Sequence, residues 1–103
     1  MKRETVTDRT DLQDFMIRNG FNFIHYNNND VKQLRNCQAW IIPVIVSGRD
    51  NIPYHGWILQ SYSTLVAISL KNQDDSIQIR EAFRKYSPTT SKQTTWFFRG
   101  YWK

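Results

Sequence analysis

A succession of short apolar runs separated by turn sequences constrains the fold of this chain more than any other feature. The longest run, Ala39 to Val46, is rich in β-branched side chains, which favour extended backbone. A turn sequence follows it at once, so we expect a hairpin there. Strands are predicted at residues 21–26, 39–46, 54–60, 63–70 and 76–79, with turns at 47–51 and 72–75.

Two details of these strands lead to further predictions. Pro43 lies inside the longest run, and because proline cannot donate to a β-ladder we expect an edge position or a bulge there. Simple alternation assigns the side chains of two strands to faces. It places Phe21, Phe23 and His25 opposite Asn22, Ile24 and Tyr26, and Leu65, Ala67 and Ser69 opposite Val66, Ile68 and Leu70.

A helix is predicted before the first strand, over residues 8–19. Leu12, Phe15 and Met16 follow helical spacing, and Asn19-Gly20 is a typical stop. Asp8 or Thr10 is expected to cap its start. Farther along the chain, residues 31–37 are ambiguous and are compatible with one short helical turn.

A second helix is predicted at the end of the chain, over residues 91–99. Thr90-Ser91-Lys92-Gln93 matches a capping box, and Gly100 can end the helix in a left-handed conformation. Pro88 opposes a helical conformation at the residue before it. The expected fold class is α+β: a single domain over 1–103, with an N-terminal helix, an antiparallel sheet of three to five strands and a C-terminal helix.

Several classes of protein are disfavoured. No apolar run approaches the roughly 20 residues of a membrane span, and the first residues lack the apolar stretch of a signal peptide. A lone Cys37 cannot form an internal disulfide or a zinc site with several cysteines. We therefore expect a protein of the host-cell cytoplasm that does not associate with membranes.

No catalytic pattern stands out. Cys37 with His25 or His55 lacks the signature of a nucleophilic pair, and adding Asp50 to the histidines gives only a weak metal-binding pattern. The four glycines are isolated, each at an expected element boundary, so a phosphate-binding glycine loop is not predicted. We expect a non-enzymatic protein with no cofactor and no metal.

The net charge of +5 is confined to one segment. The charges of the first 75 residues sum to zero. Residues 76–103 contain six basic side chains and one acidic side chain, Glu81, and they hold seven of the fifteen aromatic residues. Cations that track phosphates and rings that stack on bases are what a single-stranded nucleic-acid surface needs. Trp96 and Phe97 are expected in the core, and Tyr101 and Trp102 are assigned equally to core or surface. The predicted binding residues are Arg80, Arg84, Lys85, Lys92, Arg99, Tyr101, Trp102 and Lys103.

Two segments carry a resemblance to other proteins. Ser-Tyr-Ser-Thr-Leu-Val-Ala at 61–67 and Tyr-Ser-Pro-Thr-Thr-Ser-Lys-Gln at 86–93 resemble small uncharacterised phage and plasmid proteins. Those proteins combine an S-Y-x-T-x-V-A strand with a Y-S-x-T-T-S-(K/R)-(Q/H) helix start. The resemblance implies a mobile-element origin and a small α+β domain, and it implies no activity.

The start of the second helix is a candidate anion site. Free amides, hydroxyl groups and a lysine at Thr89, Thr90, Ser91 and Lys92 suit a phosphate or a carboxylate. The alternative is simple capping beside an exposed lysine.

Two functions follow from these observations. The first is nucleic-acid binding, to DNA or RNA, through the basic and aromatic C-terminal segment. The alternative is a protein-binding inhibitor of a host defence, such as an anti-CRISPR protein that occupies an effector complex of protein and nucleic acid. A homodimer through edge strands is a further expectation.

Overall fold

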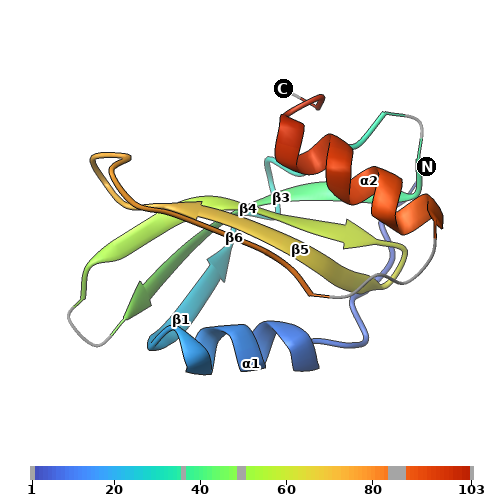
Figure 1. Cartoon of the computed structure of the whole chain (residues 1–103). Helices are drawn as coiled ribbons and strands as arrows, with labels where there is room; N and C mark the ends of the chain where they lie inside the picture. Colours follow the sequence, from blue (N-terminus) through green and yellow to red (C-terminus); the bar gives the residue numbers. More distant parts are fainter. Residues whose placement is uncertain (1, 36, 49–50, 84–87, 103) are drawn as a thin grey trace.

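An antiparallel sheet separates the two helices of the chain (Figure 1). The structure is a computed structural model and describes residues 2–35, 37–48, 51–83 and 88–102. This architecture confirms the α+β prediction, with six strands instead of three to five. The elements are α1 (Thr10–Arg18), β1 (Phe21–Tyr26), β2 (Lys32–Gln33), β3 (Ala39–Gly48), β4 (Pro53–Ser61), β5 (Thr64–Lys71), β6 (Gln78–Ala82) and α2 (Pro88–Arg99).

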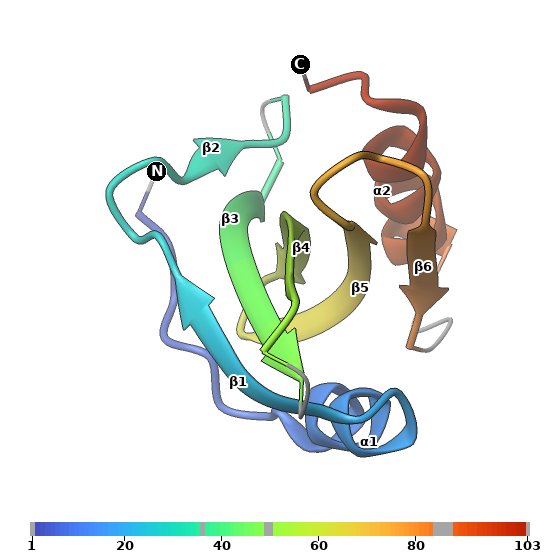
Figure 2. The same cartoon turned by 90° about the vertical axis from the view of Figure 1, so that its left-hand side faces the viewer.

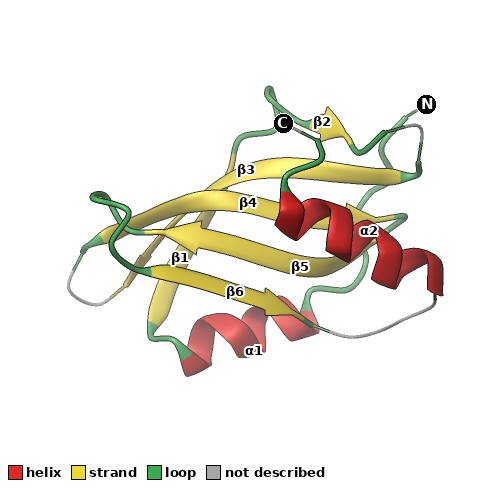
Figure 3. Cartoon of the chain, turned by 45° about the horizontal axis from the view of Figure 1, so that its top comes forward, coloured by secondary structure: helices red, strands yellow, loops and turns green. Residues whose placement is uncertain are grey.

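The strands follow the order β1-β3-β4-β5-β6, and β2 pairs with β3 beyond the end of β1 (Figure 3). The pairing between β3 and β4 confirms the expected hairpin, and β4 pairs in the same antiparallel way with β5. Residues 32–33 form a short strand, in the segment 31–37 that the sequence left ambiguous and compatible with a helical turn. The chain from residue 80 to Ala82 continues β6.

The N-terminal helix agrees with its prediction. Leu12 and Phe15 are buried, and Gly20 at φ +73° marks the end of the helix. At its start, the Asp8 carboxylate accepts a hydrogen bond from the Thr10 amide at 3.0 Å. An amide with no partner inside the helix is thereby satisfied.

Pro43 lies on β3, an inner strand with neighbours on both sides and an unbroken register to β4, so the predicted edge position or bulge is wrong. It is in register with Trp57 of β4, while on its other side its carbonyl accepts a hydrogen bond from the Asn27 amide at 2.9 Å. In an antiparallel strand the N–H and C=O of one residue point to the same neighbour. The missing N–H therefore faces the gap where β1 ends and β2 has not begun, and the ladder loses little.

Two irregularities overturn the predicted alternation. The register of β1 shifts between Phe21 and Phe23, so Ile24 packs in the core with Phe21 while Phe23 is exposed. In β5 the register shifts so that Val66 is left unpaired, and its carbonyl accepts a hydrogen bond from the Phe83 amide at 2.9 Å. The extra residue places Leu65 with Ile68 and Leu70 on one face, and Val66 with Ala67 on the other.

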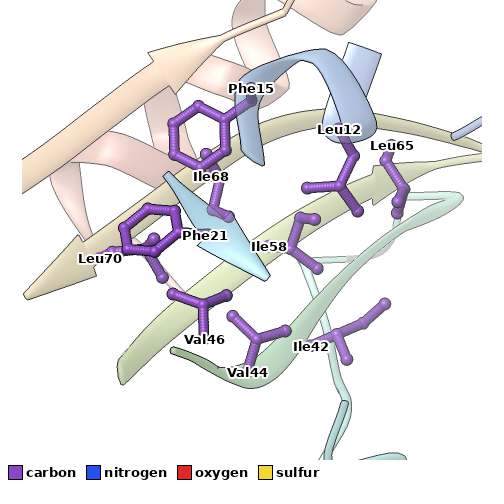
Figure 4. Packing of buried hydrophobic residues seen from close by; sticks show 10 residues of the cluster. All are labelled: Leu12, Phe15, Phe21, Ile42, Val44, Val46, Ile58, Leu65, Ile68 and Leu70. Atoms are coloured by element: carbon purple, nitrogen blue, oxygen red, sulfur yellow. The ribbon is translucent and has the colours of Figure 1, made fainter. Parts of the chain in front are cut away.

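Each face of the sheet has its own core. The face towards α1, the α1 face, packs aliphatic side chains against Leu12 and Phe15 of the helix (Figure 4). The other face, the α2 face, packs against Phe97 of α2. The buried strand residues are Phe21, Ile42, Val44, Val46, Ile58, Leu65, Ile68 and Leu70 on the α1 face, and Ala39, Ile41, Leu59, Val66 and Ala67 on the α2 face.

Tyr26 leads to a prediction about stability. Its hydroxyl is buried and has no hydrogen-bond partner among the described residues, and burial raises the pKa of this group, an effect that nearby Arg9 opposes. Because an unpaired buried hydroxyl costs free energy, Tyr26→Phe should raise the free energy of unfolding by roughly 1 kcal/mol at neutral pH.

The raised pKa of Tyr26 also fixes the sign of a pH effect. Its contribution is fully present below the pKa of an unfolded tyrosine, about 10, and is lost as the pH rises through the folded value. Urea denaturation from neutral to alkaline pH should show a smaller alkaline loss in Tyr26→Phe. A variant that is destabilised, with an unchanged alkaline loss, would contradict this account.

Candidate nucleic-acid interface

The last helix begins earlier than its capping pattern predicts. α2 starts at Pro88, which suits a first helical turn because the N–H it lacks needs no partner there. Thr90 lies within the helix and is buried, and its carbonyl accepts a hydrogen bond from the Thr94 hydroxyl at 2.9 Å. The side chain of Gln93 accepts a hydrogen bond from the buried Ser61 hydroxyl at 2.8 Å. The capping box is therefore wrong, since its residues dock the helix on the sheet.

The four residues of the predicted anion site do not form one exposed surface. Thr89 and Lys92 are exposed, Ser91 is half-buried and Thr90 is buried. Lys92 lies instead 5.3 Å from the centre of the Trp96 ring, one helical turn farther along. It belongs to a cluster on the side of the helix.

Five residues make up this α2 cluster, in which cations alternate with aromatic rings. The guanidinium of Arg35 lies 4.4 Å from the centre of the Trp96 ring and 5.7 Å from that of Tyr101. Lys92 contacts the same Trp96 ring, and Arg99 lies 3.4 Å from the Tyr101 hydroxyl. Each of the contacts between a cation and a ring face stabilises the arrangement by about 0.5–1 kcal/mol at exposed sites.

The geometry of α2 explains how the cluster forms. Residues 92, 96 and 99 are spaced by four and three, so they lie on one side of the helix. Gly100 at φ +72° ends the helix as predicted, and the Tyr101 amide donates to the Trp96 carbonyl at 3.1 Å. Arg35 comes from the connection between β2 and β3, far away in the sequence, and nothing in its local sequence points to this role.

The C-terminal aromatic residues are divided between the core and the surface. Phe97 is buried as expected, Trp96 is half-buried, and Tyr101 is 50% exposed. Trp102 folds back instead: its indole N–H donates to the Phe97 carbonyl at 3.1 Å, and its ring lies 5.2 Å from that of Trp57, edge to face. Tyr101 therefore remains available to a ligand, whereas Trp102 mainly closes the core beneath it.

The remaining predicted binding residues lie apart from the cluster or outside the described residues. Arg80 projects from β6, where its guanidinium lies 5.8 Å from the centre of the Phe98 ring. Lys32 of β2, which the sequence did not single out, lies 5.8 Å from the Trp102 ring. Arg84, Lys85 and Lys103 lie outside the described residues.

The charges around α2 are not neutralised within the described part of the chain. The ion pairs found there are Arg18–Asp14, Arg18–Glu81 and His55–Asp75, and none involves a cation beside α2. Unpaired cations grouped on one side attract polyanions. The cations in question are Lys32, Arg35, Arg80, Lys92 and Arg99.

Half of the α2 face is covered by neither helix. Figure 1 shows α2 over one end of the sheet, while the end that carries the β3–β4 and β5–β6 connections is uncovered on that face. Figure 2 looks at the sheet from this end, with α1 below it and α2 behind β5 and β6. We call this surface the open half. Its side chains, identified from the cross-strand register, include Phe23, His25, Ile45, His55, Trp57, Lys71 and Arg80.

The open half adjoins the end of α2. One hollow is lined by Trp57, Lys71, Arg80, Phe98 and Trp102, and so joins strand and helix residues. A second hollow lies beside His25, Ile45 and His55. The sequence pattern missed this surface because the register shift in β1 and the position of Gly56 inside β4 hide which side chains face outward.

Within residues 2–35, 37–48, 51–83 and 88–102, no three His, Cys, Asp or Glu side chains are grouped so as to hold a metal ion. The side chain of Cys37 packs against the core of the α2 face. Neither of the described helices is long and apolar enough to cross a membrane.

Comparison with known proteins places the chain in a family. Neither the curated proteins nor the solved structures yield a match. A family model does match, over residues 7–103. The match covers both helices and all six strands, and the chain therefore belongs to the Family of unknown function (DUF8033).

Proposed function

We propose that this protein binds nucleic acid through the α2 cluster and the cations around it. The observation that carries the proposal is the group of five basic side chains beside α2 that have no carboxylate partner among the described residues. Such a surface attracts phosphates without needing sequence recognition. The proposed role is one of binding without catalysis.

The aromatic members of the cluster support the same proposal. Tyr101 is half-exposed, with Arg35 over its ring and Arg99 beside its hydroxyl, so the ring can take part in stacking while the guanidinium groups reach phosphates. Arg35 lies against Trp96 and Tyr101, which holds its side chain in place before a ligand arrives. A pre-ordered cation loses less entropy on binding than a free one.

The cellular setting is part of the proposal and rests on the resemblance carried by residues 61–67 and 86–93. We place the protein in the cytoplasm of a host cell, as an accessory protein of a phage or plasmid. The competing role, an inhibitor that binds a host defence protein, makes a different prediction. A protein partner that stays bound after nuclease treatment would favour the inhibitor.

A matched pair of variants tests the proposal. Arg35→Gln removes a cation from the α2 cluster, and Arg9→Gln removes one that also lies on an aromatic ring, 5.1 Å from the centre of Tyr26, but on the α1 face. We expect Arg35→Gln to weaken binding of labelled oligonucleotides roughly tenfold at low salt, because one phosphate contact is lost.

Fluorescence anisotropy at low salt measures both affinities. Arg9→Gln should stay within about twofold of the unmodified protein, since a distant charge acts only through a screened field. Equal losses in the two variants would mean that net charge alone drives binding, and the absence of any binding would refute the proposal.

A further inference from the structure

The open half presents two apolar side chains that lie outside both cores, Phe23 and Ile45, together with Trp57, which packs partly against the core of the α2 face. Phe23 is 72% exposed and Ile45 is 53% exposed, although both lie on strands of the sheet next to buried neighbours. Trp57 is half-buried, with one edge against Trp102. Exposed apolar groups gathered on one face of a small protein mark a binding surface.

Cross-strand pairing arranges this surface in rows. His25 is in register with Ile45, Ile45 with His55, and His55 with Lys71. The neighbouring row runs from Pro43 through Trp57 and Ser69 to Arg80. Four inter-strand spacings from β1 to β6 give the surface a width of roughly 19 Å.

The polar groups of the open half are mainly basic or neutral. Lys71 and Arg80 lie on the side of β5 and β6, next to the hollow that leads to Phe98 and Trp102. A carboxylate oxygen of Asp75 lies 4.0 Å from Nε2 of His55 at this surface. Apolar rings on β1 and β4 and cations along the border with α2 are complementary to exposed bases on an anionic backbone.

We infer that the open half is a stacking platform for single-stranded nucleic acid, and that the bases lie on Phe23 and Trp57 while the backbone follows the cations beside α2. This inference rests on the proposed function and adds the class of substrate. A duplex keeps its base faces inside the helix, where rings on a sheet cannot reach them. A strand with unpaired bases offers both its bases and its phosphates to this surface.

The test compares single-stranded and duplex probes of equal length, of about 20 nucleotides. We expect the protein to bind oligothymidylate or oligouridylate about tenfold more tightly than duplex. Phe23→Ala should weaken single-strand binding at least fivefold, because the free energy of stacking one base on an aromatic ring corresponds to about that change in affinity. Duplex binding should be unchanged. Since Phe23 is mostly exposed, this variant should fold normally.

Two further variants complete the design. Ile17→Ala removes a side chain that is 79% exposed on α1, away from the α2 face, and should change neither affinity. Stacking should quench tryptophan fluorescence, and Trp57→Phe should reduce this quenching while keeping a ring that can stack.

The outcomes separate this inference from the proposed function. Equal binding of single strand and duplex, with no effect of Phe23→Ala, would overturn the platform; if Arg35→Gln still weakened binding, the α2 cluster would stand alone. No binding to any probe would overturn both.

Discussion

Gly56→Ala is expected to lose about 3 kcal/mol or more of its free energy of unfolding. A Cβ atom at Gly56 would lie 1.9 Å from the Ser69 carbonyl oxygen and 2.9 Å from the Leu70 Cα. Both are backbone atoms of the neighbouring strand β5. They cannot rotate away as a side chain would, so β4 and β5 would have to separate.

The strands would separate next to a core and next to the open half. Gly56 is in register with Leu70 of the α1-face core, and it lies between His55 and Trp57 of the open half. Since natural domains are stable by only about 5–15 kcal/mol, this loss would take a large share of the total. The variant should therefore unfold at a markedly lower urea concentration.

Gly20→Ala is the matched control. Gly20 has φ +73°, and apart from its chain neighbours no atom lies within 4 Å of the place that a Cβ atom would take. Alanine there adds only backbone strain, which costs about 1–2 kcal/mol. A Gly56→Ala variant no less stable than Gly20→Ala would show that the two strands are farther apart than the Gly56–Ser69 geometry requires.

The second large effect concerns binding. Replacing Arg35 and Arg99 together by glutamine should weaken nucleic-acid binding roughly 100-fold at about 50 mM salt, since each lost phosphate contact removes about one order of magnitude. Both side chains contact Tyr101, so their removal also leaves that ring without its cations.

The double variant Arg9→Gln with Arg18→Gln provides the control of equal charge. It also removes two arginines, but from the region of α1, where Arg18 is already paired with Asp14 and Glu81. Its affinity should fall less than about threefold, because distant charges are screened, and thermal unfolding of both doubles checks that each is folded. Similar losses in the two doubles would place the binding surface elsewhere or make it diffuse.

The sequence was sufficient for the parts of the fold that depend on local chemistry. Leu12 and Phe15 at helical spacing predicted α1, and Gly100 predicted the end of α2. The expected hairpin between β3 and β4 and the expected turn at 72–75 formed because Asn51 and Asp75 adopt positive φ. Tyr62 is a counter-example: it belongs to the segment 61–67 that resembles an S-Y-x-T-x-V-A strand, but it takes φ +53° in the turn between β4 and β5 and is exposed.

The features that position the candidate site depend on long-range contacts. The register shifts in β1 and β5 decide that Phe23 faces outward and that Val66 packs under α2, and no local signal announces them. Gln93 matched a helix cap, but its bond to Ser61 exists only because α2 lies on the sheet. Arg35 contacts Trp96, which is far away in the sequence, and composition cannot show such a pairing.

The salt dependence of binding tests the central claim most directly. If the five cations beside α2 each contact a phosphate, a plot of log affinity against log salt for a single strand should have a slope of about −3.5. The variant lacking Arg35 and Arg99 should give about −2.1 by the same relation. Equal slopes for the two proteins, or an affinity that does not change with salt, would contradict the claim that this surface binds nucleic acid.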